Sequence, residues 1–251
     1  MTDPVERFSN RVANCVKYRP HYPAEIVGYL AEKCGLTTDS VIADIGCGTG
    51  ISSRIFLENG NSVIGVEPNA AMRQAAGEYL AAFPKFELVD ATSTETSLPE
   101  NSVDFVVAAQ AFHWFDPEKT RTEFHRILKP GGHIVLMWNE RQLDSTPFLV
   151  DYEALLIKYA YDYGNVRHEN IGTDQLSDFF RTEYAAATFP NHQDFDFEGI
   201  KGRMLSSSYM PNESDAVFVD MVKELRSLFA KHAENGRIRV LYDTNVYSSQ
   251  V

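Results

Sequence analysis

The stretch Asp44-Ile45-Gly46-Cys47-Gly48-Thr49-Gly50 decides the fold of this chain. Residues 41–45 form a short apolar run flanked by turn residues, which is typical of a strand buried on both faces of a parallel sheet. A helical pattern begins directly after the stretch, at Ile51. Glycines between such a strand and a helix allow a sharp turn and a close approach of the backbone to a ligand. The alternative is a tight turn that binds no ligand. The acids Asp44, Glu67 and Asp90 favour a ligand-binding loop.

The spacing of the glycines and the nearby acids indicates the kind of ligand. A dinucleotide fingerprint requires Gly-x-Gly-x-x-Gly or Ala, whereas Ile51 occupies the last position here. Asp44 would disfavour a pyrophosphate and favour a cation. Glu67 ends the next strand and can accept two hydrogen bonds from a ribose diol, and Asp90 ends the third strand and can accept one from an adenine amino group. S-adenosylmethionine, a positively charged nucleoside without a pyrophosphate, fits these groups.

Strands and helices alternate outward from this loop. The patterns predict strands over 41–45, 62–66, 86–89, 103–109, 133–138, 184–197 and 237–248. They predict helices over 4–16, 23–34, 51–59, 70–82, 117–128, 147–163, 174–181 and 214–233. Asn69 and Asp116 are the expected N-caps of two of these helices, and Gly35 is an expected C-terminal stop. The alternation predicts an α/β, doubly wound, Rossmann-like sheet with a mixed edge formed by the two late strands.

Composition excludes several classes of protein. Lys and Arg number 23 against 35 Asp and Glu, and the net charge of −12 argues against a nucleic-acid partner. The three cysteines form no Cys-x-x-Cys pair and the histidines show no metal-ligand spacing, so we expect reduced thiols and no metal site. With no long apolar run or signal-peptide pattern, we expect a cytoplasmic protein without a membrane partner.

The sequence resembles the class I S-adenosylmethionine-dependent methyltransferases over nearly the whole chain. The matching pieces are residues 41–50, Glu67-Pro68-Asn69, Asp90-Ala91, Asp104-Phe105-Val106 and Leu128-Lys129-Pro130-Gly131-Gly132. Three further pieces are similar to the methyltransferase type 11 branch that includes trans-aconitate methyltransferase-like enzymes. They are Tyr18-Arg19-Pro20-His21-Tyr22-Pro23, residues 110–116 and Trp138-Asn139-Glu140-Arg141.

The resemblance implies one methyltransferase domain over 1–251 with a seven-stranded mixed sheet. Within it we expect N-terminal lid helices over 1–35, a cofactor-binding core over 36–139, an inserted helical cap over 140–182, and strands and a helix over 183–251 that complete the sheet. The implied cofactor is S-adenosylmethionine. The residues expected to bind it are Asp44, Gly46, Cys47, Gly48 and Gly50 for the methionine part, Glu67 for the ribose, Pro68, Asn69, Met72, Asp90 and Ala91 for the adenine, and Gln110 and Ala111 as a cover.

The acceptor of the methyl group is expected at the carboxyl ends of the strands, where open α/β sheets bind ligands. Residues expected to take part in the reaction are Tyr18, Arg19 and His113, and those expected to contact the acceptor are Tyr22, Trp114, Trp138, Asn139 and Arg141. The alternative is that these aromatic residues pack in the core and do not contact the acceptor. A small molecule is the expected acceptor: a carboxylate needs no base and would suit Arg19 and Arg141, whereas a hydroxyl or amine would need one such as His113. The rival functions are a nicotinamide-dependent oxidoreductase and a non-catalytic S-adenosylmethionine-binding module.

Overall fold

A seven-stranded mixed sheet forms the centre of the molecule, with strand order β3-β2-β1-β4-β5-β7-β6. The computed structural model describes residues 16–161, 172–207 and 209–251. The strands are β1 (Val41–Ile45), β2 (Ser62–Val66), β3 (Phe86–Val89), β4 (Val103–Ala109), β5 (Leu128–Arg141), β6 (Ala185–Phe195) and β7 (Ile238–Gln250). The first five pair in parallel, and β7 runs antiparallel between β5 and β6. The predicted doubly wound sheet with a mixed edge is confirmed.

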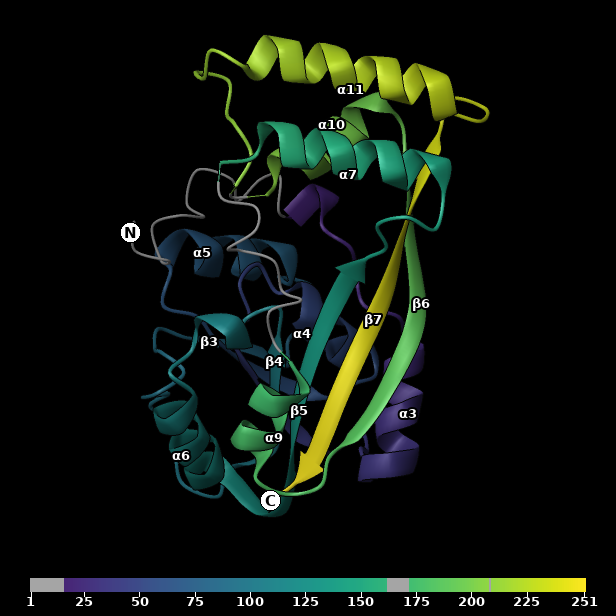
Figure 1. Ribbon diagram of the computed structural model, residues 1–251. Coiled ribbons are helices and arrows are strands. Elements are labelled where there is room, and N and C mark those ends of the chain that lie inside the picture. The colour runs from purple at the N-terminus through teal and green to yellow at the C-terminus, as the bar shows by residue number, and fades with distance from the viewer. Residues whose placement is uncertain (1–15, 162–171, 208) are drawn as a thin grey trace.

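Helices cover both faces of the sheet and its carboxyl edge (Figure 1). They are α3 (Glu25–Cys34), α4 (Ile51–Glu58), α5 (Ala70–Tyr79), α6 (Pro117–Ile127), α7 (Pro147–Tyr159), α9 (Thr173–Phe180), α10 (Phe197–Leu205) and α11 (Phe218–His232), with a 3-10 turn η2 (Phe112–Trp114). The helices α7, α10 and α11 lie together beyond the end of β5, and we call these three helices the cap. The cap therefore lies beyond the sheet edge where the glycine loop ends β1.

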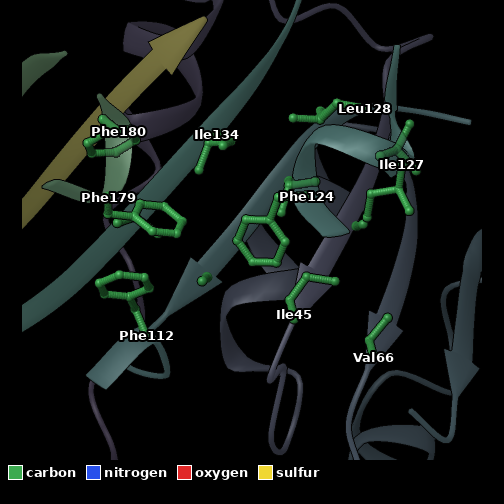
Figure 2. Packing of buried hydrophobic residues seen from close by; sticks show 14 of the residues in the cluster. Ile45, Val66, Phe112, Phe124, Ile127, Leu128, Ile134, Phe179 and Phe180 are labelled. Atoms are coloured by element: carbon green, nitrogen blue, oxygen red, sulfur yellow. The ribbon is translucent and has the colours of Figure 1, made fainter. Parts of the chain in front are cut away.

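Two apolar layers hold the helices against the sheet. On one face, Phe124 and Ile127 of α6 and Phe179 of α9 pack with Ile134 of β5 and Phe112, and all five are buried (Figure 2). On the other face, buried residues of α3 and α4 pack on the same strands; they include Ile26, Leu30, Ile55 and Phe56. Burial of each such side chain contributes roughly 1.5–3 kcal/mol. These layers fix the positions at which the strands end, and hence the site.

The helix ends follow the sequence signals. The Asn69 side chain accepts a hydrogen bond from the Met72 amide at the start of α5, and Asp116 accepts one from the Lys119 amide at the start of α6. Gly35 ends α3 in the left-handed conformation, with φ 70°. Each predicted cap is thus confirmed, because each rests on a local backbone requirement.

The expected helical cap over 140–182 is wrong in its second half. The helix α9 packs against α6 because Leu176, Phe179 and Phe180 form a continuous apolar side. In its place α10, which the sequence patterns did not predict, and α11 join α7. The predicted helix over 117–128 ends at Ile127, and β5 already begins at Leu128, earlier than the predicted strand over 133–138. The expected helix over 4–16 and most of the lid region over 1–35 before α3 lie outside the described residues, which begin at residue 16.

No helix in residues 16–161, 172–207 or 209–251 is long and apolar enough to cross a membrane. Within the same ranges no three His, Cys, Asp or Glu side chains are grouped so as to hold a metal ion.

Candidate functional site

The glycine loop between β1 and α4 requires glycine for two separate reasons. Gly46, Gly48 and Gly50 all have positive φ, at 69°, 57° and 82°. A Cβ on Gly46 would lie 2.8 Å from the Cβ of Ala111, and one on Gly50 would lie 2.6 Å from Cδ1 of Leu80. No described atom lies within 4 Å of the corresponding position on Gly48. The backbone at Gly48 is therefore open to a ligand, as expected for a loop that approaches one closely.

Asp44, at the end of β1, is the most unusual charged group of the site. Its side chain is fully buried, and its Oδ2 accepts hydrogen bonds from the hydroxyls of Ser52 (2.7 Å) and Ser53 (2.6 Å). Its Oδ1 has no hydrogen-bond partner among the described residues. Burial raises the pKa of Asp44 to about 6, although the two serine hydroxyls oppose the shift. A buried carboxylate oxygen without a donor is costly unless a cation or a donor reaches it.

Glu67 joins the glycine loop to the loop after β2. Its Oε2 accepts a hydrogen bond from the Gly48 amide (3.0 Å) and its Oε1 accepts one from the Asn69 amide (2.8 Å). The side chain is 9% exposed, and burial raises its pKa. Each carboxylate oxygen can accept more than one hydrogen bond, so a ribose diol can still bind there.

Asp90 and Ala91 follow β3 at the same edge of the sheet. Arg73 of α5 donates to the Glu67 carbonyl oxygen (2.7 Å) and to Oδ2 of Asp90 (2.6 Å), which links the ends of β2 and β3. Asp90 is largely exposed. Pro68, Asn69 and Met72 lie at the start of α5 beside this link. The structure thus brings the expected adenine-binding residues to one place.

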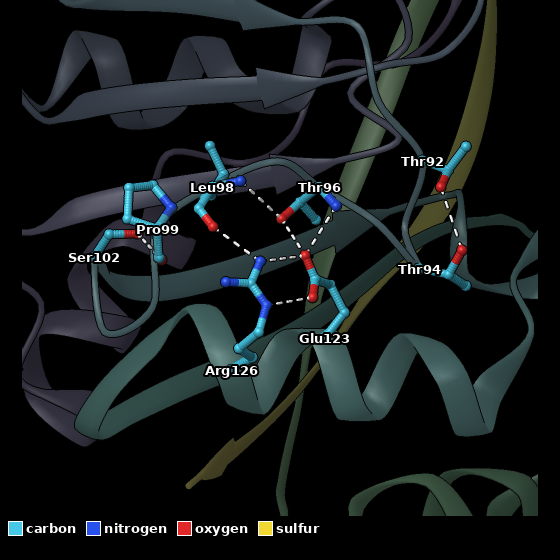
Figure 3. Close-up of polar contacts among 8 residues, drawn as sticks. All are labelled: Thr92, Thr94, Thr96, Leu98, Pro99, Ser102, Glu123 and Arg126. Atoms are coloured by element: carbon cyan, nitrogen blue, oxygen red, sulfur yellow. Dashed lines mark hydrogen bonds and ion pairs between the residues drawn. The ribbon is translucent and has the colours of Figure 1, made fainter.

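The loop that follows Ala91 is tied to α6 by a buried carboxylate (Figure 3). Glu123 accepts hydrogen bonds from the amide (2.9 Å) and hydroxyl (2.5 Å) of Thr96, and from Nε and Nη2 of Arg126 (2.7 Å each). Arg126 also donates to the Leu98 carbonyl oxygen. The Arg126 guanidinium lowers the pKa of Glu123 to about 2. This network holds the loop after β3 in place.

Gln110 and Ala111 follow β4 and lie next to the glycine loop. Gln110 has φ 55°, its Nε2 donates to the Asn139 carbonyl oxygen (3.1 Å), and its buried Oε1 has no hydrogen-bond partner among the described residues. Ala111 contacts Gly46 closely, as described above. Cys47 is buried within the loop, and burial raises the pKa of its thiol well above the usual value, which suits a small filler.

Residues 18–23 cross the carboxyl edge of the sheet and are held there by amide side chains. Asn139 of β5 donates to the carbonyl oxygens of Pro20 (3.5 Å) and His21 (3.4 Å), and Asn191 of β6 donates to that of His21 (2.7 Å). Asn139 Oδ1 in turn accepts from Thr244 and Asn191. Asn139 therefore positions the N-terminal segment, and its amide is occupied by protein partners.

Replacing Asn139 by alanine is expected to release residues 18–23 from the sheet. The change leaves the Asn191 amide, the Thr244 hydroxyl and two backbone carbonyls without this partner, and we expect it to lower the free energy of unfolding by roughly 1–3 kcal/mol. Hydrogen exchange of a peptide covering residues 16–26 should speed up. Asn245→Ala is the matched control, because Asn245 pairs with Thr188 on the same sheet without contacting the segment. Equal exchange in both variants would contradict this role.

Tyr22 and Tyr18 of this segment point to different parts of the molecule. Tyr22 is buried in the core layer of α3 and α4, and burial together with the nearby Asp44 charge raises its pKa. Tyr18 packs against Gly202 of α10, where a Cβ would lie 2.1 Å from its ring. Arg19 donates from Nη2 to the Ser206 carbonyl oxygen (3.1 Å). The segment thus connects the neighbourhood of Asp44 with the cap.

Trp138 does not share a site with Asn139. It is 2% exposed and packs edge-on to Phe112 and Tyr247 in the core layer of α6 and α9. Successive side chains of a strand point to opposite faces, so neighbouring residues of β5 cannot both face the N-terminal segment. The prediction that Trp138 contacts the acceptor is therefore corrected to core packing.

Arg141 and the residues of η2 complete the predicted set. The guanidinium of Arg141 forms an ion pair with Glu153 of α7 and lies 5.3 Å from the ring centroid of Tyr152, so its charge is already balanced within the protein. His113 is half-buried and its ring lies against that of Trp114, with centroids 4.7 Å apart and the ring planes tilted by 47°, and Trp114 is 36% exposed. His113 and Trp114 follow the Gln110 and Ala111 pair in sequence, after Phe112.

Sequence reasoning missed several residues that hold the site together. They are Ser52 and Ser53 on Asp44, Arg73 between Glu67 and Asp90, and Asn191 on the N-terminal segment. The two serines directly after the glycine loop are a usable signal, since hydroxyls in the first turn of a helix can reach back to the strand end. Arg73 and Asn191 carry no such signal, because their partners are distant in sequence.

Comparison with known proteins agrees with this geometry. Residues 43–136 match the model of the methyltransferase domain family. The chain is 26% identical over 251 residues to an uncharacterized methyltransferase-like protein of Schizosaccharomyces pombe, a match covering 98% of this chain and 96% of that one. It is 35% identical over 134 residues to an uncharacterized methyltransferase of Mycobacterium bovis, covering 53% of this chain and 52% of that protein, so it spans about half the length of that relative.

Among solved structures, a protein of Anaeromyxobacter dehalogenans assigned as a type II methyltransferase superposes with a TM-score of 0.69 at 18% identity, covering 93% of this chain and 98% of that one. At this identity the likeness concerns the fold. The donor groups also fit the S-adenosylmethionine that the sequence predicts: the Asp44 oxygen that has no partner among the described residues suits an ammonium group, and Gly48 leaves its backbone open. The chain is thus similar to methyltransferases in its family match over residues 43–136, and its sheet order and overall fold are similar to those of a solved methyltransferase structure.

Proposed function

We propose that this protein transfers a methyl group from S-adenosylmethionine to a small-molecule acceptor, with a carboxylate preferred as the acceptor group. One observation supports the cofactor site above all others. Asp44 is fully buried with one carboxylate oxygen held by two serine hydroxyls and the other without a partner among the described residues. That arrangement leaves one oxygen for a cationic group at the open glycine loop.

Each part of the cofactor is assigned to groups that meet at the carboxyl edge of the sheet. Asp44 and the backbone at Gly46, Gly48 and Gly50 hold the methionine part, with Cys47 as packing beneath it. Glu67 binds the ribose hydroxyls. Pro68, Asn69, Met72, Asp90 and Ala91 surround the adenine, and Gln110 and Ala111 cover the cofactor. The Oε1 of Gln110, which has no partner among the described residues, is a further acceptor for the ammonium.

When bound, S-adenosylmethionine supplies a methyl group on a sulfonium, whose leaving group is already good. The residues of this chain then need only to place the acceptor in line with that group and to exclude water. Positioning of this kind can lower a barrier by roughly 7–11 kcal/mol. Residues 18–23 and the cap lie on the side of the site where an acceptor would enter, and Tyr22 is close to Asp44.

The nature of the acceptor decides whether a base is needed. A carboxylate arrives ionised, so no proton has to move, whereas a hydroxyl or an amine would require a base. For a hydroxyl or amine acceptor we assign His113 as the base, because it lies in η2, shortly after β4 and the Gln110 and Ala111 pair. The carboxylate preference rests on Arg19 of the N-terminal segment, and on the similarity of residues 18–23 and 110–116 to trans-aconitate methyltransferase-like enzymes.

Transfer of a labelled methyl group tests this proposal directly. The protein is incubated with methyl-labelled S-adenosylmethionine and a small-molecule extract, and products are identified by mass spectrometry. We expect label in one small molecule or in a related group of them, and none with the Glu67→Gln variant, which weakens cofactor binding. Label only in macromolecules would contradict the small-molecule acceptor, and cofactor binding without any transfer would support a binding module. Oxidation of reduced nicotinamide would support the oxidoreductase rival.

A further inference from the structure

The helix α7 of the cap exposes apolar side chains on its outer side. Val150 is 49% exposed and Ile157 is 61% exposed, and Ala154 between them is exposed as well. In a helix of 3.6 residues per turn, positions 150, 154 and 157 lie on one face. We call these three residues the outer stripe. Apolar side chains that gather on one face, unlike scattered ones, mark a contact with another molecule.

The outer stripe is unusual because the opposite side of α7 is the side that packs in the cap. The buried residues on that side are Phe148, Leu149, Tyr152, Leu155 and Leu156. The helix α7 is therefore apolar on two opposite sides, whereas a helix with one covered side normally carries polar residues on the other. The neighbouring α11 has that usual pattern, since its exposed residues include Asp220, Lys223 and Arg226. A helix that is apolar on both sides is expected to be covered on both.

One edge of the outer stripe carries two charges of opposite sign. Asp151 and Lys158 each follow a residue of the stripe and lie seven positions apart, on the edge beside α11 (Figure 1). Within the chain Asp151 pairs with Lys231 (2.7 Å) and His232 (2.6 Å), and Lys158 pairs with Glu224 (2.6 Å). The side chain of Asp151 is still 31% exposed and that of Lys158 is 58% exposed. Both charges can therefore contact a further molecule.

This pattern of apolar and charged residues is complementary to itself. When two copies of α7 pack antiparallel about a two-fold axis at Ala154, Val150 of each copy lies opposite Ile157 of the other. The small side chain at the axis allows the two helices to approach closely. The same edge of each helix then faces its counterpart, so Asp151 of each copy lies opposite Lys158 of the other. A two-fold contact joins the same patch on both copies, so every apolar and charged pairing occurs twice.

We propose that the outer stripe is the interface of a homodimer, in which α7 packs antiparallel on α7 of a second copy of this chain. The contact is confined to one helix of 13 residues from each copy, which is small for a permanent dimer. The dimer is therefore reversible, with a dissociation constant of roughly 1–100 μM. This inference is independent of the proposed function, because no residue of the outer stripe is assigned to the cofactor or to the acceptor.

Sedimentation velocity over protein concentrations from about 1 to 200 μM tests the dimer, since association depends on concentration by mass action. The wild type is expected to pass from monomer to dimer across this range. Ala154→Glu places two carboxylates against each other at the axis and should raise the dissociation constant roughly ten-fold or more. Val219→Glu is the matched control, because Val219 is a 74% exposed residue of α11 outside the stripe, and it should associate as the wild type does. Circular dichroism at the lowest concentration checks that all three proteins fold alike.

Cross-linking of single cysteines with a short bismaleimide tests the register. A mixture of the Val150→Cys and Ile157→Cys proteins should give a covalent dimer with one chain of each, and Ala154→Cys should give a dimer by itself. Val150→Cys alone should cross-link poorly, because its two copies lie about 12 Å apart along the helices, four residues to either side of the axis. Wild type treated in the same way gives the background from the native cysteines.

Three results would overturn the homodimer. They are a wild type that stays monomeric at the highest concentration, a dimer that is equally stable in Ala154→Glu, and a cross-link of Val150→Cys to itself in preference to Ile157→Cys. Binding of a monomeric wild type to phosphatidylcholine vesicles, lost in Ala154→Glu, would assign the outer stripe to a lipid surface and would overturn it as well.

Discussion

Replacing Glu67 by glutamine should weaken the binding of S-adenosylhomocysteine roughly ten- to a hundred-fold. The carboxylate accepts hydrogen bonds from the amides of Gly48 and Asn69, which fix its orientation, and its remaining lone pairs are assigned to the ribose hydroxyls. A hydrogen bond to a charged group contributes about 1.5–3 kcal/mol, which corresponds to this loss of affinity. Glutamine keeps the shape but has one oxygen acceptor in place of two and no charge, so the glycine loop should also lose part of its anchoring.

Isothermal calorimetry on both proteins measures this effect, with Glu87→Gln as the matched control. Glu87 is an exposed residue of β3, near the site in sequence order but pointing to solvent. Its replacement should leave the dissociation constant within about two-fold of the wild-type value, a change of about 0.4 kcal/mol. A dissociation constant of Glu67→Gln that stays within the same range would remove Glu67 from the cofactor site.

Replacing Asp44 by asparagine should abolish the pH dependence of cofactor binding near pH 6. In the folded protein the pKa of Asp44 is about 6, and the cofactor ammonium binds best to the ionised form. Wild-type affinity for S-adenosylhomocysteine is therefore expected to rise as the pH increases from 5 to 7.5. The asparagine variant should bind about ten- to a hundred-fold more weakly at pH 7.5, with little change across this range.

The stability of the cofactor-free protein should move in the opposite direction. The folded pKa of Asp44 lies above the ordinary aspartate value of 3.8, so the unfolded chain ionises first as the pH rises. The free energy of unfolding is therefore expected to fall between about pH 4 and pH 6, by roughly 3 kcal/mol for this group, and to stay lower above pH 6. The asparagine variant lacks this loss, so it should gain stability relative to wild type over the same interval.

Urea unfolding at a series of pH values, with and without S-adenosylhomocysteine, separates the two effects. Asp39→Asn, at an exposed turn before β1, is the control that removes the same charge without touching the site. A stability difference between wild type and Asp44→Asn that is constant from pH 4 to pH 7.5 would contradict the buried carboxylate. Parallel binding curves for the two proteins would contradict its contact with the ammonium group.

Local patterns were enough to predict most of the elements and the class of cofactor. The apolar run of β1, the glycines after it and the acids that end β2 and β3 each depend on a few consecutive residues, and their order along the chain predicts their meeting at one sheet edge. The N-caps Asn69 and Asp116 are local in the same sense. These features can be predicted because the residue types that the local backbone requires are themselves the pattern seen in the sequence.

Features that depend on distant partners could not be predicted in this way. Trp138 and Arg141 are among the residues predicted to contact the acceptor. Trp138 packs in the core layer of α6 and α9, and Arg141 pairs with Glu153 of α7. The helix α9, expected in the cap, packs on α6. The helix α10 joins the cap, although the sequence patterns did not predict a helix there. In each case the residue's partner is distant in sequence, and only the packing of the folded chain brings the two together.

The sequence by itself determined the doubly wound sheet, the glycine loop and the three acids Asp44, Glu67 and Asp90, because strand periodicity, backbone conformation and strand-end charge are properties of short segments. Only the tertiary structure decided which charges remain unbalanced. Asp44 keeps one oxygen without a partner among the described residues, and Arg141 pairs with Glu153 of α7. Charge balance depends on distance through space, so it is decided only when the sheet and the cap are folded.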